Sequence, residues 1–470
     1  MQWQWQWQWQ WQWQWHRHRT GLTLTLFIIL AALTTGIPAT AAPATSTSLT
    51  STTVVEALNR AAHPLRTVEP GGDTRDLRPL DRMIGDARVV GLGEATHSSH
   101  DFFALKARVF RHLVEEKGFR TFALEAPWST GLRLNDYVLH GKGDPRHIMR
   151  AEFQRDYLWW NNTDYLRLVE WMRGYNVRHP GDPVSFMGDD IAWTGPESYD
   201  AVEDYAADAR PELSARLAEL YRGLRPTVPT GAYIEQYLRL PYAERKERAE
   251  RTGEALALLR QQSADGAGTA ADTEAYDWAV QQATVIDQTA RQYDFDVEDP
   301  AQIAEAMRYR DGVMAANVVW WQEHTGAKVL LSAHNNHVGH VPEVPAENPK
   351  VQGAFLRARL GAGYVSVGLT FGRGSFNATG RDDDTIRRWT LGPADPGSNE
   401  RTLDRVRHGG DHVLDLRSVG SPADDWLRRA RPTRSIGTAY PDGPHDIALA
   451  RSYDVLIHLR EVEAARLRDR

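Results

Sequence analysis

The sequence predicts an α/β protein with a mostly parallel central sheet flanked by helices, and with a helical insertion covering the cleft at the carboxyl ends of the strands. Short apolar runs bounded by turn residues recur along the chain, as the strands of a buried sheet require. Segments with helical spacing of apolar residues separate these runs, which is typical of βαβ units with parallel strands. Between about 197 and 325 the chain is charged, has helical periodicity and carries few strand signals, which indicates the insertion.

Helices and strands alternate along the first half of the chain. Helices are predicted at 54–62, 76–84, 102–117 and 164–175, and strands at 88–92, 121–125 and 183–188. Gly118 follows the third helix, where glycine commonly forms the C-cap. Later strands are predicted at 328–332, 364–370, 412–416 and 455–459. The Gly- and Asp-rich residues 371–384 are expected to form a long loop, and residues 263–271 to interrupt the insertion.

The first 41 residues are expected to be processing sequence rather than part of the fold. Gln and Trp alternate up to Trp15, arginines then precede an apolar segment at 22–33, and Ala39 to Ala41 fit a signal-peptide cleavage site. The apolar segment is shorter than the about 20 residues that span a membrane. We therefore expect a secreted or extracytoplasmic protein, with no stable membrane association after the signal is removed.

A flexible lead-in rich in Ala, Ser and Thr is expected at 42–53, followed by a catalytic domain at 54–470. The chain has 470 residues, a formal net charge of −7 and no basic stripe, so nucleic acid is not an expected partner. It contains no cysteine, which excludes disulfides, thiolate metal sites and cysteine nucleophiles.

Ionisable residues follow four of the predicted strands at the point where each strand ends. In the order of the strands they are Glu94 and His97, Glu125, Asp189 and Asp190, and His334 and His337. Ligands of open parallel sheets bind beyond the carboxyl ends of the strands, so we expect these side chains to meet in one pocket.

The residue types in this set suit general acid–base chemistry. Histidine titrates near neutral pH and can take a proton from water, so His97 is a candidate base. A carboxylate, from Glu94 or Glu125, would fix the tautomer of that histidine. His334 or His337 could polarise a carbonyl or protonate a leaving alkoxide. Such a set could hydrolyse an ester without a serine nucleophile. The absence of a Gly-x-Ser-x-Gly motif argues against a serine hydrolase with a nucleophile elbow.

Two other functions remain open for the same residues. Glu94-x-x-His97 and His334-x-x-His337 have plausible metal-ligand spacings, and their N and O ligands suit zinc, manganese or iron. The metalloprotease motif His-Glu-x-x-His is absent. A metal-dependent hydrolase and a non-catalytic ligand-binding protein are therefore the alternatives to a metal-independent esterase.

Further residues are expected to bind the substrate or to support the site: His337, His100, Lys106, Trp128, Asp190 and Arg310. Four tryptophans lie just after or near the predicted strand ends: Trp128, Trp159, Trp160 and Trp193. An aromatic wall of such residues would suit a large apolar substrate, and core packing is the alternative for each. Arg310 could orient a carboxylate of the pocket or form a structural ion pair. Lys106 could face the pocket or solvent.

Several motifs together resemble the erythromycin esterase family. They are Gly-Leu-Gly-Glu94-Ala-Thr-His97-Ser-Ser-His100, the run from Gly118 to Glu125, Phe186-Met-Gly-Asp-Asp190, Tyr309-Arg310-Asp311 and Ser332-Ala-His334-Asn-Asn-His337. The similarity runs from about residue 76 to 369 in one order. It implies an α/β sheet with a helical portion over a deep cleft, and hydrolysis that is best known on the macrolactone ester of macrolide antibiotics.

The resemblance also implies roles for individual residues. Water would be activated by His97, with Glu94 and Glu125 assisting and His334 as a further histidine, and no metal or other cofactor would be required. Ser98 stands where the family usually has glycine, and the export signal differs from resistance members that act inside cells. We therefore expect a small-molecule ester as the substrate, with a macrolactone as one candidate.

Overall fold

The computed structural model describes residues 46–262, 269–296, 298–383 and 385–469. The Gln-Trp tract, the expected signal peptide and the first part of the expected lead-in lie outside the described residues, as does most of the expected break at 263–271. Within the described ranges, no helix has the length and apolar character that a membrane span needs.

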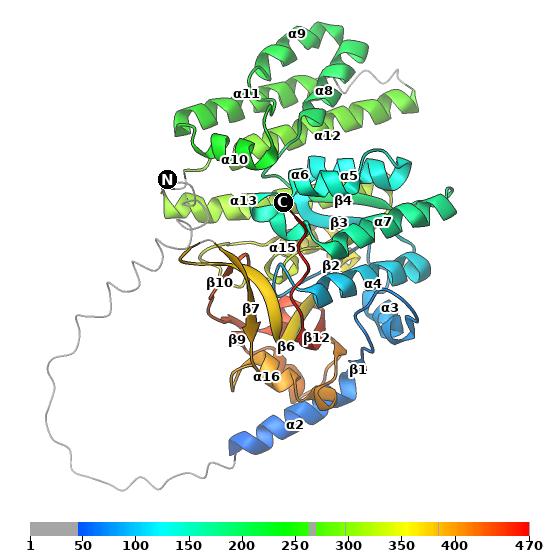
Figure 1. The fold of residues 1–470 in the computed structure, drawn as a ribbon, viewed down its shortest axis with the longest axis vertical. Coiled ribbons are helices and arrows are strands. Elements are labelled where there is room, and N and C mark those ends of the chain that lie inside the picture. The colour runs from blue at the N-terminus through cyan, green and yellow to red at the C-terminus, as the bar shows by residue number, and fades with distance from the viewer. Residues whose placement is uncertain (1–45, 263–268, 297, 384, 470) are drawn as a thin grey trace, which may run out of the picture.

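A ten-stranded sheet forms the centre of the molecule, with the order β1-β8-β12-β6-β2-β5-β3-β4 and with β7 and β10 paired to β6 (Figure 1). Its strands are β1 (His63–Pro64), β2 (Val89–Leu92), β3 (Phe119–Pro127), β4 (Ser185–Asp190), β5 (Lys328–Ser332), β6 (Tyr364–Gly380), β7 (Ile386–Leu391), β8 (His412–Asp415), β10 (Ala439–Tyr440) and β12 (Val455–Val462). The pairs from β12 across to β4 are parallel, whereas β1, β7 and β8 pair antiparallel. The predicted α/β fold with a mostly parallel sheet is confirmed.

Helices pack on both faces of this sheet. They include α2 (Ser46–Ala61), α3 (Arg78–Ile84), α4 (His100–Lys117), α5 (Trp128–His140), α6 (Pro145–Glu152), α7 (Thr163–Arg178), α14 (Asn335–Val338), α15 (Gln352–Leu360), α16 (Asn399–Leu403), α17 (Ala423–Leu427) and α18 (Leu449–Ser452). Alternate residues of a strand enter different cores: Phe122 joins the core under α4 and α7, and Ala123 joins the core on the opposite face. Gly118 ends α4 with φ 71°, as the sequence predicts.

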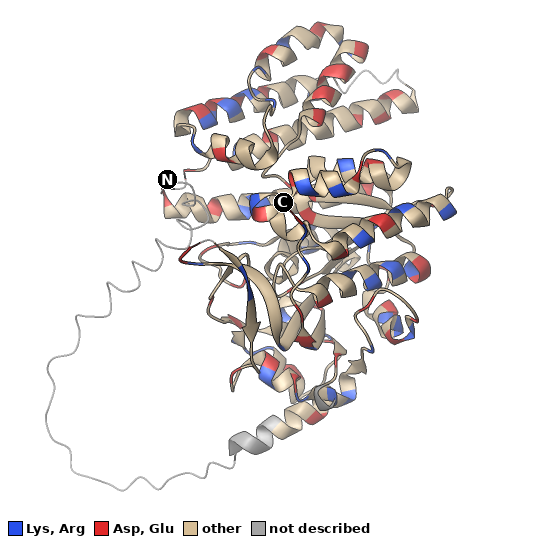
Figure 2. Ribbon diagram, viewed as in Figure 1, with Lys and Arg blue, Asp and Glu red and all other residues tan. Residues whose placement is uncertain are grey.

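The described residues between β4 and β5 form helices joined by loops. The helices are α8 (Pro196–Ala209), α9 (Pro211–Leu220), α10 (Thr230–Leu238), α11 (Tyr242–Arg260), α12 (Ala270–Gln292) and α13 (Pro300–Thr325). Helices α8, α9, α11 and α12 share a core of their own (Figure 1). Acidic and basic residues are mixed along α11, whereas every charged residue of α8 is acidic (Figure 2). Of these helices, α13 packs against β4, and it carries Arg310 and Asp311 to the ends of the strands.

Two local predictions are wrong. Residues 371–380 are not a loop, because β6 continues to Gly380 between β7 and β12. Glycines in this part of β6 allow neighbouring backbone to approach closely. A Cβ on Gly374, where φ is 129°, would lie 2.0 Å from Val462 O. The expected flexible lead-in is also shorter than predicted, because α2 begins at Ser46. This helix is held by tertiary contacts of Val54 and Leu58 that the local composition does not reveal.

Candidate active site

A close contact between the ends of β2 and β5 brings the two histidine-bearing loops together. A Cβ on Gly93 would lie 2.1 Å from Asn335 Oδ1, so only glycine fits at the end of β2. The backbone N–H of Asn335 donates to Glu94 O at 2.9 Å. The Asn335 side chain bonds both backbone groups of Leu369 on β6, at 2.7 and 3.0 Å. The ends of β2 and β5 are therefore held in one arrangement with the neighbouring part of β6.

The first histidine of the site is held by a buried carboxylate. His97 Nδ1 lies 3.0 Å from Glu94 Oε1, and Glu94 has no exposed surface. A carboxylate can only accept here, so Nδ1 carries the proton and Nε2 is left with its lone pair. The other carboxylate oxygen accepts from Lys106 Nζ, which also donates to Ser332 Oγ at 3.0 Å and to Ala333 O at 3.2 Å.

Lys106 is fully buried, and the structure brings it to the carboxylate rather than to solvent. Burial lowers the pKa of Lys106, and the charge of Glu94 opposes that effect. The ammonium thereby compensates a carboxylate that would otherwise be a lone charge in the core.

The second histidine of the site lies beside the first. The ring centroids of His97 and His334 are 4.9 Å apart. His334 Nδ1 accepts from the backbone N–H of Asn336 at 3.3 Å, so a neutral His334 carries its proton on Nε2. That nitrogen is buried and has no partner among the described residues. Burial and the neighbouring His97 hold the pKa of His334 well below its ordinary value, which keeps the ring neutral.

A second network, of hydrogen bonds and ion pairs around Glu125, holds the backbone of His334 in place. Glu125 Oε2 accepts from the backbone N–H of His334 at 2.9 Å, and Glu125 Oε1 faces His337 Nε2 at 3.2 Å and Arg310 Nη2 at 3.1 Å. Arg310 also reaches Asp190 Oδ2 at 2.5 Å, so this arginine joins the ends of β3 and β4 to α13.

The charges of this network support one another. Burial alone would raise the pKa of Glu125, but His337 and the other neighbouring cations hold it well below its usual range. Burial alone would lower the pKa of His337, but Asp311, 2.6 Å from Nδ1, and Glu125 raise it well above its usual range. His337 is therefore a cationic bridge between two carboxylates.

The two acidic residues at the end of β4 have different surroundings. Asp190 belongs to the network, whereas Asp189 is fully buried and accepts from Gln352 Nε2 at 2.6 Å. Burial and the charge of Asp190 raise the pKa of Asp189 well above its ordinary value. Asp189 therefore braces α15 rather than facing the reacting groups.

Two residues expected near the substrate lie elsewhere. His100 Nδ1 bonds Asp164 Oδ1 and its Nε2 bonds Glu69 Oε1, each at 3.0 Å, so it ties the start of α4 to α7. The side chain of Trp128 packs edge-on against Trp320, with ring centroids 5.7 Å apart, and against other tryptophans of α12 and α13. Of the two interpretations of Trp128, core packing is the one that the structure shows, because its ring is buried among these tryptophans.

The aromatic side chain beside the first histidine is Trp160, three residues before α7 begins. Trp160 meets the His97 ring edge-on, with centroids 5.2 Å apart, and its Nε1 donates to Glu125 O at 2.6 Å. Trp160 ends η2, the 3₁₀ helix Arg155–Trp160. Tyr157 of the same helix donates from its hydroxyl to Asp190 Oδ2 at 2.8 Å.

Sequence reasoning missed several supporting residues of the site. They are Tyr157, Tyr165, Asn348 and Gln352. Tyr165 bonds Ser332 Oγ at 2.8 Å, and Asn348 and Gln352 both donate to Asp311. None follows a strand end or sits in a charged motif, so no local signal could have found them.

The C-terminal tail, residues 463–469, runs along the loop that carries His97. The backbone N–H of Ala465 donates to Ser98 O at 3.2 Å, and that of His100 donates to Glu463 O at 2.7 Å. Asn377 Nδ2 of β6 donates to both Ser98 Oγ, at 3.0 Å, and Ala465 O, at 2.8 Å. Ser98 is fully buried under the tail, which gives this serine a structural role.

A metal site is a poor fit to the geometry of the histidine loops. Among the residues that the structure describes, no group of three His, Asp or Glu side chains is arranged to hold an ion. Both oxygens of Glu94 are engaged by His97 and by the Lys106 ammonium. A ligand carboxylate would instead turn a free oxygen toward the metal.

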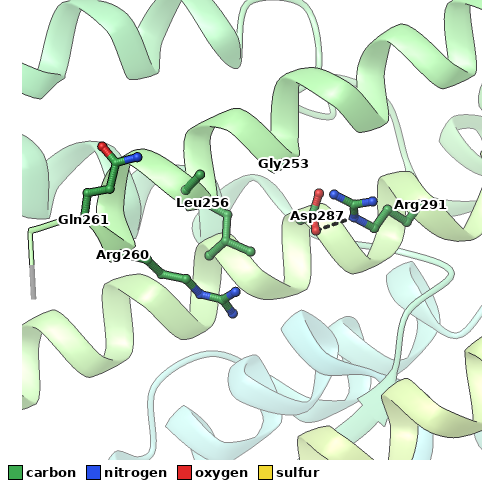
Figure 3. Close-up of a pocket in the computed structure, with 7 residues that line it drawn as sticks. Gly253, Leu256, Arg260, Gln261, Asp287 and Arg291 are labelled. Carbon is green, nitrogen blue, oxygen red and sulfur yellow. Dashed lines mark hydrogen bonds and ion pairs between the residues drawn. The ribbon is translucent and has the colours of Figure 1, made fainter.

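A groove of about 580 Å³ lies outside this site, between α11 and α12 (Figure 3). It is lined by Gly253, Leu256, Ala257, Arg260, Gln261, Asp287 and Arg291. Asp287 and Arg291 are paired with each other at 2.7 Å, and none of the strand-end residues lines the groove. We therefore assign the chemistry to the strand ends and not to this groove.

Comparisons with known proteins agree with the fold and with the motifs. A family model described as erythromycin esterase matches residues 114–462. The erythromycin esterase type II of Escherichia coli is 24% identical over 359 residues, which cover 72% of this chain and 83% of that protein. A solved succinoglycan biosynthesis protein has a TM-score of 0.78 at 29% identity, covering 89% of this chain and 99% of that one. A mutant of the erythromycin esterase EreC in its open conformation has a TM-score of 0.68 at 16% identity, covering 87% and 100%, which concerns the fold alone.

Proposed function

Because the chain belongs to the erythromycin esterase family, whose members are hydrolases, we propose that it cleaves a carboxylic ester with a water molecule that His97 activates. The observation that carries this proposal is the orientation of two neighbouring imidazoles. His97 presents a bare Nε2, because Glu94 holds its Nδ1, and His334 presents an Nε2–H that has no partner among the described residues.

The reaction follows from these two nitrogens. His97 Nε2 takes a proton from water as the oxygen attacks the ester carbonyl carbon, and Glu94 stabilises the imidazolium that forms. His334 Nε2–H donates to the carbonyl oxygen as it becomes an oxyanion. When the tetrahedral intermediate collapses, the imidazolium of His97 returns its proton to the leaving alkoxide. No covalent intermediate with the protein is needed.

The other network of the site holds these groups in position. Glu125 binds the backbone N–H of His334, while Arg310 and His337 compensate the charge of Glu125. Fixed dipoles and paired charges lose little energy in reorganisation when the transition state forms. The network therefore supports hydrolysis without itself exchanging protons.

The substrate proposal is an ester of a small molecule. A macrolactone is one candidate, supported by the similarity to the E. coli erythromycin esterase. An acylated saccharide is another, supported by the likeness to a succinoglycan biosynthesis protein. A panel of aryl esters, macrolides and acylated saccharides, followed by mass spectrometry, separates these classes.

The mechanism is tested with the chain from Ala42 onward and its variant His97→Ala. We expect the variant to lose hydrolysis by about 10²–10⁴-fold, with an unchanged unfolding midpoint. The same assay with and without a chelator separates this proposal from a metal-dependent hydrolase, because activity should persist after chelation. Complete loss on chelation, restored by zinc or manganese, would establish the metal mechanism instead.

We also propose that the protein is exported and cleaved near Ala41. The support is the order of charged, apolar and small residues at the N-terminus. N-terminal sequencing of the protein recovered from the culture medium or cell envelope tests this. Recovery of the uncleaved chain from the cytosol would contradict it.

A further inference from the structure

An unbroken line of hydrogen bonds runs from a tyrosine on α7 to the histidine that activates water. Tyr165 Oη lies 2.8 Å from Ser332 Oγ, and Ser332 Oγ accepts from Lys106 Nζ at 3.0 Å. Lys106 Nζ also donates to Glu94 Oε2, and Glu94 Oε1 lies 3.0 Å from His97 Nδ1. The line joins α7, β5, α4 and the loop after β2, and its first four residues are called the relay below.

The relay lies away from bulk water. Glu94, Lys106 and Ser332 have no exposed surface, and Tyr165 is 2% exposed. Bulk water therefore cannot replace a lost partner, and each missing hydrogen bond leaves an unsatisfied buried group. The placement of each member consequently depends on the next one.

The ammonium of Lys106 has one acceptor for each of its hydrogens. An ammonium carries three N–H donors, and the acceptors here are Glu94 Oε2, Ser332 Oγ and Ala333 O. Burial lowers the pKa of Lys106, so its charged form depends on these acceptors. A weaker acceptor would favour the neutral amine and leave the charge of Glu94 less compensated.

Tyr165 is placed rigidly enough to hold Ser332. It lies in the first turn of α7, where its backbone N–H donates to the side chain of the N-cap residue Asn162 at 2.9 Å. Its ring centroid is 4.8 Å from that of Phe103 and 5.7 Å from that of Trp160. Burial raises the pKa of Tyr165 well above its usual range, so the hydroxyl stays neutral. A fixed neutral hydroxyl orients Ser332 without adding a charge.

We propose that Tyr165 is a positioning residue of the hydrolytic site. Through Ser332, its hydroxyl holds the Lys106 ammonium against Glu94. The ammonium in turn limits how strongly Glu94 attracts the imidazolium proton of His97. This inference rests on the hydrolytic function proposed above and concerns the strength of the base at that same site.

The consequence of removing the hydroxyl has a definite direction. With the ammonium held less well, Glu94 keeps more of its negative charge and stabilises the imidazolium of His97 more strongly. His97 then stays protonated, and unable to act as a base, up to a higher pH. The other titratable groups facing the relay are Glu125, Asp164 and His334, which stay unchanged in the variants below.

The test measures kcat/KM on an aryl ester from about pH 5 to 10 for the wild-type protein and for Tyr165→Phe, which keeps the ring. We expect the acid limb of the profile to move upward by about half a pH unit, which is about a threefold loss of activity well below its midpoint. The plateau at high pH should stay within about twofold of the wild type. A purely structural loss would lower the plateau and leave the limb in place.

A double-variant cycle tests whether the hydroxyl acts through Ser332. Ser332→Ala removes an acceptor of the ammonium itself and should move the limb in the same direction by about one pH unit. Tyr165→Phe should add nothing to that shift in the double variant, because its only route to the ammonium is gone. If Ser332→Ala does not fold, Tyr165→Phe and the control below decide the question by themselves.

Tyr175→Phe is the matched control. It removes a hydroxyl from the same helix, α7, and should change neither the plateau nor the limb. An unmoved or lowered limb in Tyr165→Phe, an equal shift in the control, or additive shifts in the double variant would overturn the inference. Each of these results would leave the hydrolytic function standing.

NMR titration of the His97 imidazole reads out the relay without turnover. The protein is labelled with carbon-13 at histidine Cε1, and the His97 signal is the one missing from His97→Ala. A midpoint that Tyr165→Phe raises by about half a pH unit, in a protein that hydrolyses no ester, would support the relay and refute the esterase. A midpoint that Tyr165→Phe does not raise would refute the relay whatever the esterase result.

Discussion

The imidazole of His334 lies with its centroid 4.9 Å from that of His97, and its Nε2 is buried without a hydrogen-bond partner among the described residues. A buried donor without a partner costs about 1–3 kcal/mol. When a negative charge develops on the substrate, this N–H is already in position to stabilise it, so no reorganisation is needed.

We expect His334→Gln to lower kcat by about 10²–10³-fold with little change in KM, since the oxyanion donor is lost and ground-state binding is not. The pKa of His334 is held well below its ordinary value, so this residue does not titrate in the working range. The shape of the pH–rate profile should therefore survive the substitution. A profile that loses its acid limb in the variant would assign the base role to His334.

Removal of the buried Lys106 ammonium should leave Glu94 as an unpaired buried charge. Lys106→Met is expected to lower the free energy of unfolding by about 3–5 kcal/mol. The double variant Lys106→Met/Glu94→Gln should recover much of that stability, because the lone charge is gone, but should stay inactive, because the His97 tautomer is no longer fixed. Denaturant unfolding and kcat on an aryl ester measure the two effects. A double variant as unstable as the sum of the singles would refute the pairing.

His100 should prove to be a structural residue. Its pKa is raised to about 9, chiefly by Asp164, so its ion pair stabilises the fold fully below the unfolded value of 6.5 and is lost as pH rises through about 9. His100→Gln is therefore expected to destabilise the protein by about 1–2 kcal/mol at pH 6 and by much less at pH 10. Thermal unfolding at both pH values tests this, with Asp164→Asn as the matched variant. A destabilisation independent of pH would exclude the ion pair as its source.

A second histidine makes the fold sensitive to acid. Burial lowers the pKa of His412 from 6.5 to about 3. Below pH 6.5 the unfolded chain therefore binds a proton at this histidine, whereas the folded protein binds it only near pH 3. Stability is consequently lost as pH falls through that window. His412→Asn, which can still donate to Gly410 O, should reduce the loss between pH 7 and 5 by roughly 2 kcal/mol. The exposed His147 supplies the control, and His147→Asn should leave the pH dependence unchanged.

The C-terminal tail should be needed for full activity. Removal of residues 463–470 takes away the backbone contacts to Ser98 and His100 that hold the His97 loop. We expect kcat to fall about 10- to 100-fold, because small displacements of a reacting group are costly. Asn377→Ala, which removes one hydrogen bond to the tail and one to Ser98, should give a smaller loss in the same direction. An unchanged kcat in a folded truncated protein would show that the tail does not position the loop.

The local sequence by itself determined where the reacting groups leave the sheet. Apolar runs ending in Glu94, Glu125 and His334 predict buried strands, and the carboxyl ends of parallel strands lie along one edge, so these residues had to be neighbours. Hydrophobic periodicity and chain order suffice for that conclusion. The same reasoning failed for residues 371–380, because the glycines of β6 serve close backbone contacts with β12 that only the folded sheet contains.

The tertiary structure alone decided which partner each group takes. The sequence left either Glu94 or Glu125 as the carboxylate of His97; the structure pairs Glu94 with His97 and turns Glu125 toward His337 and Arg310. Hydrogen bonds of about 3 Å depend on side-chain direction and on contacts between elements far apart in the chain, which no local pattern encodes. For the same reason only the structure placed His100 and Trp128 away from the reacting histidines and, of the candidate tryptophans, Trp160 against His97.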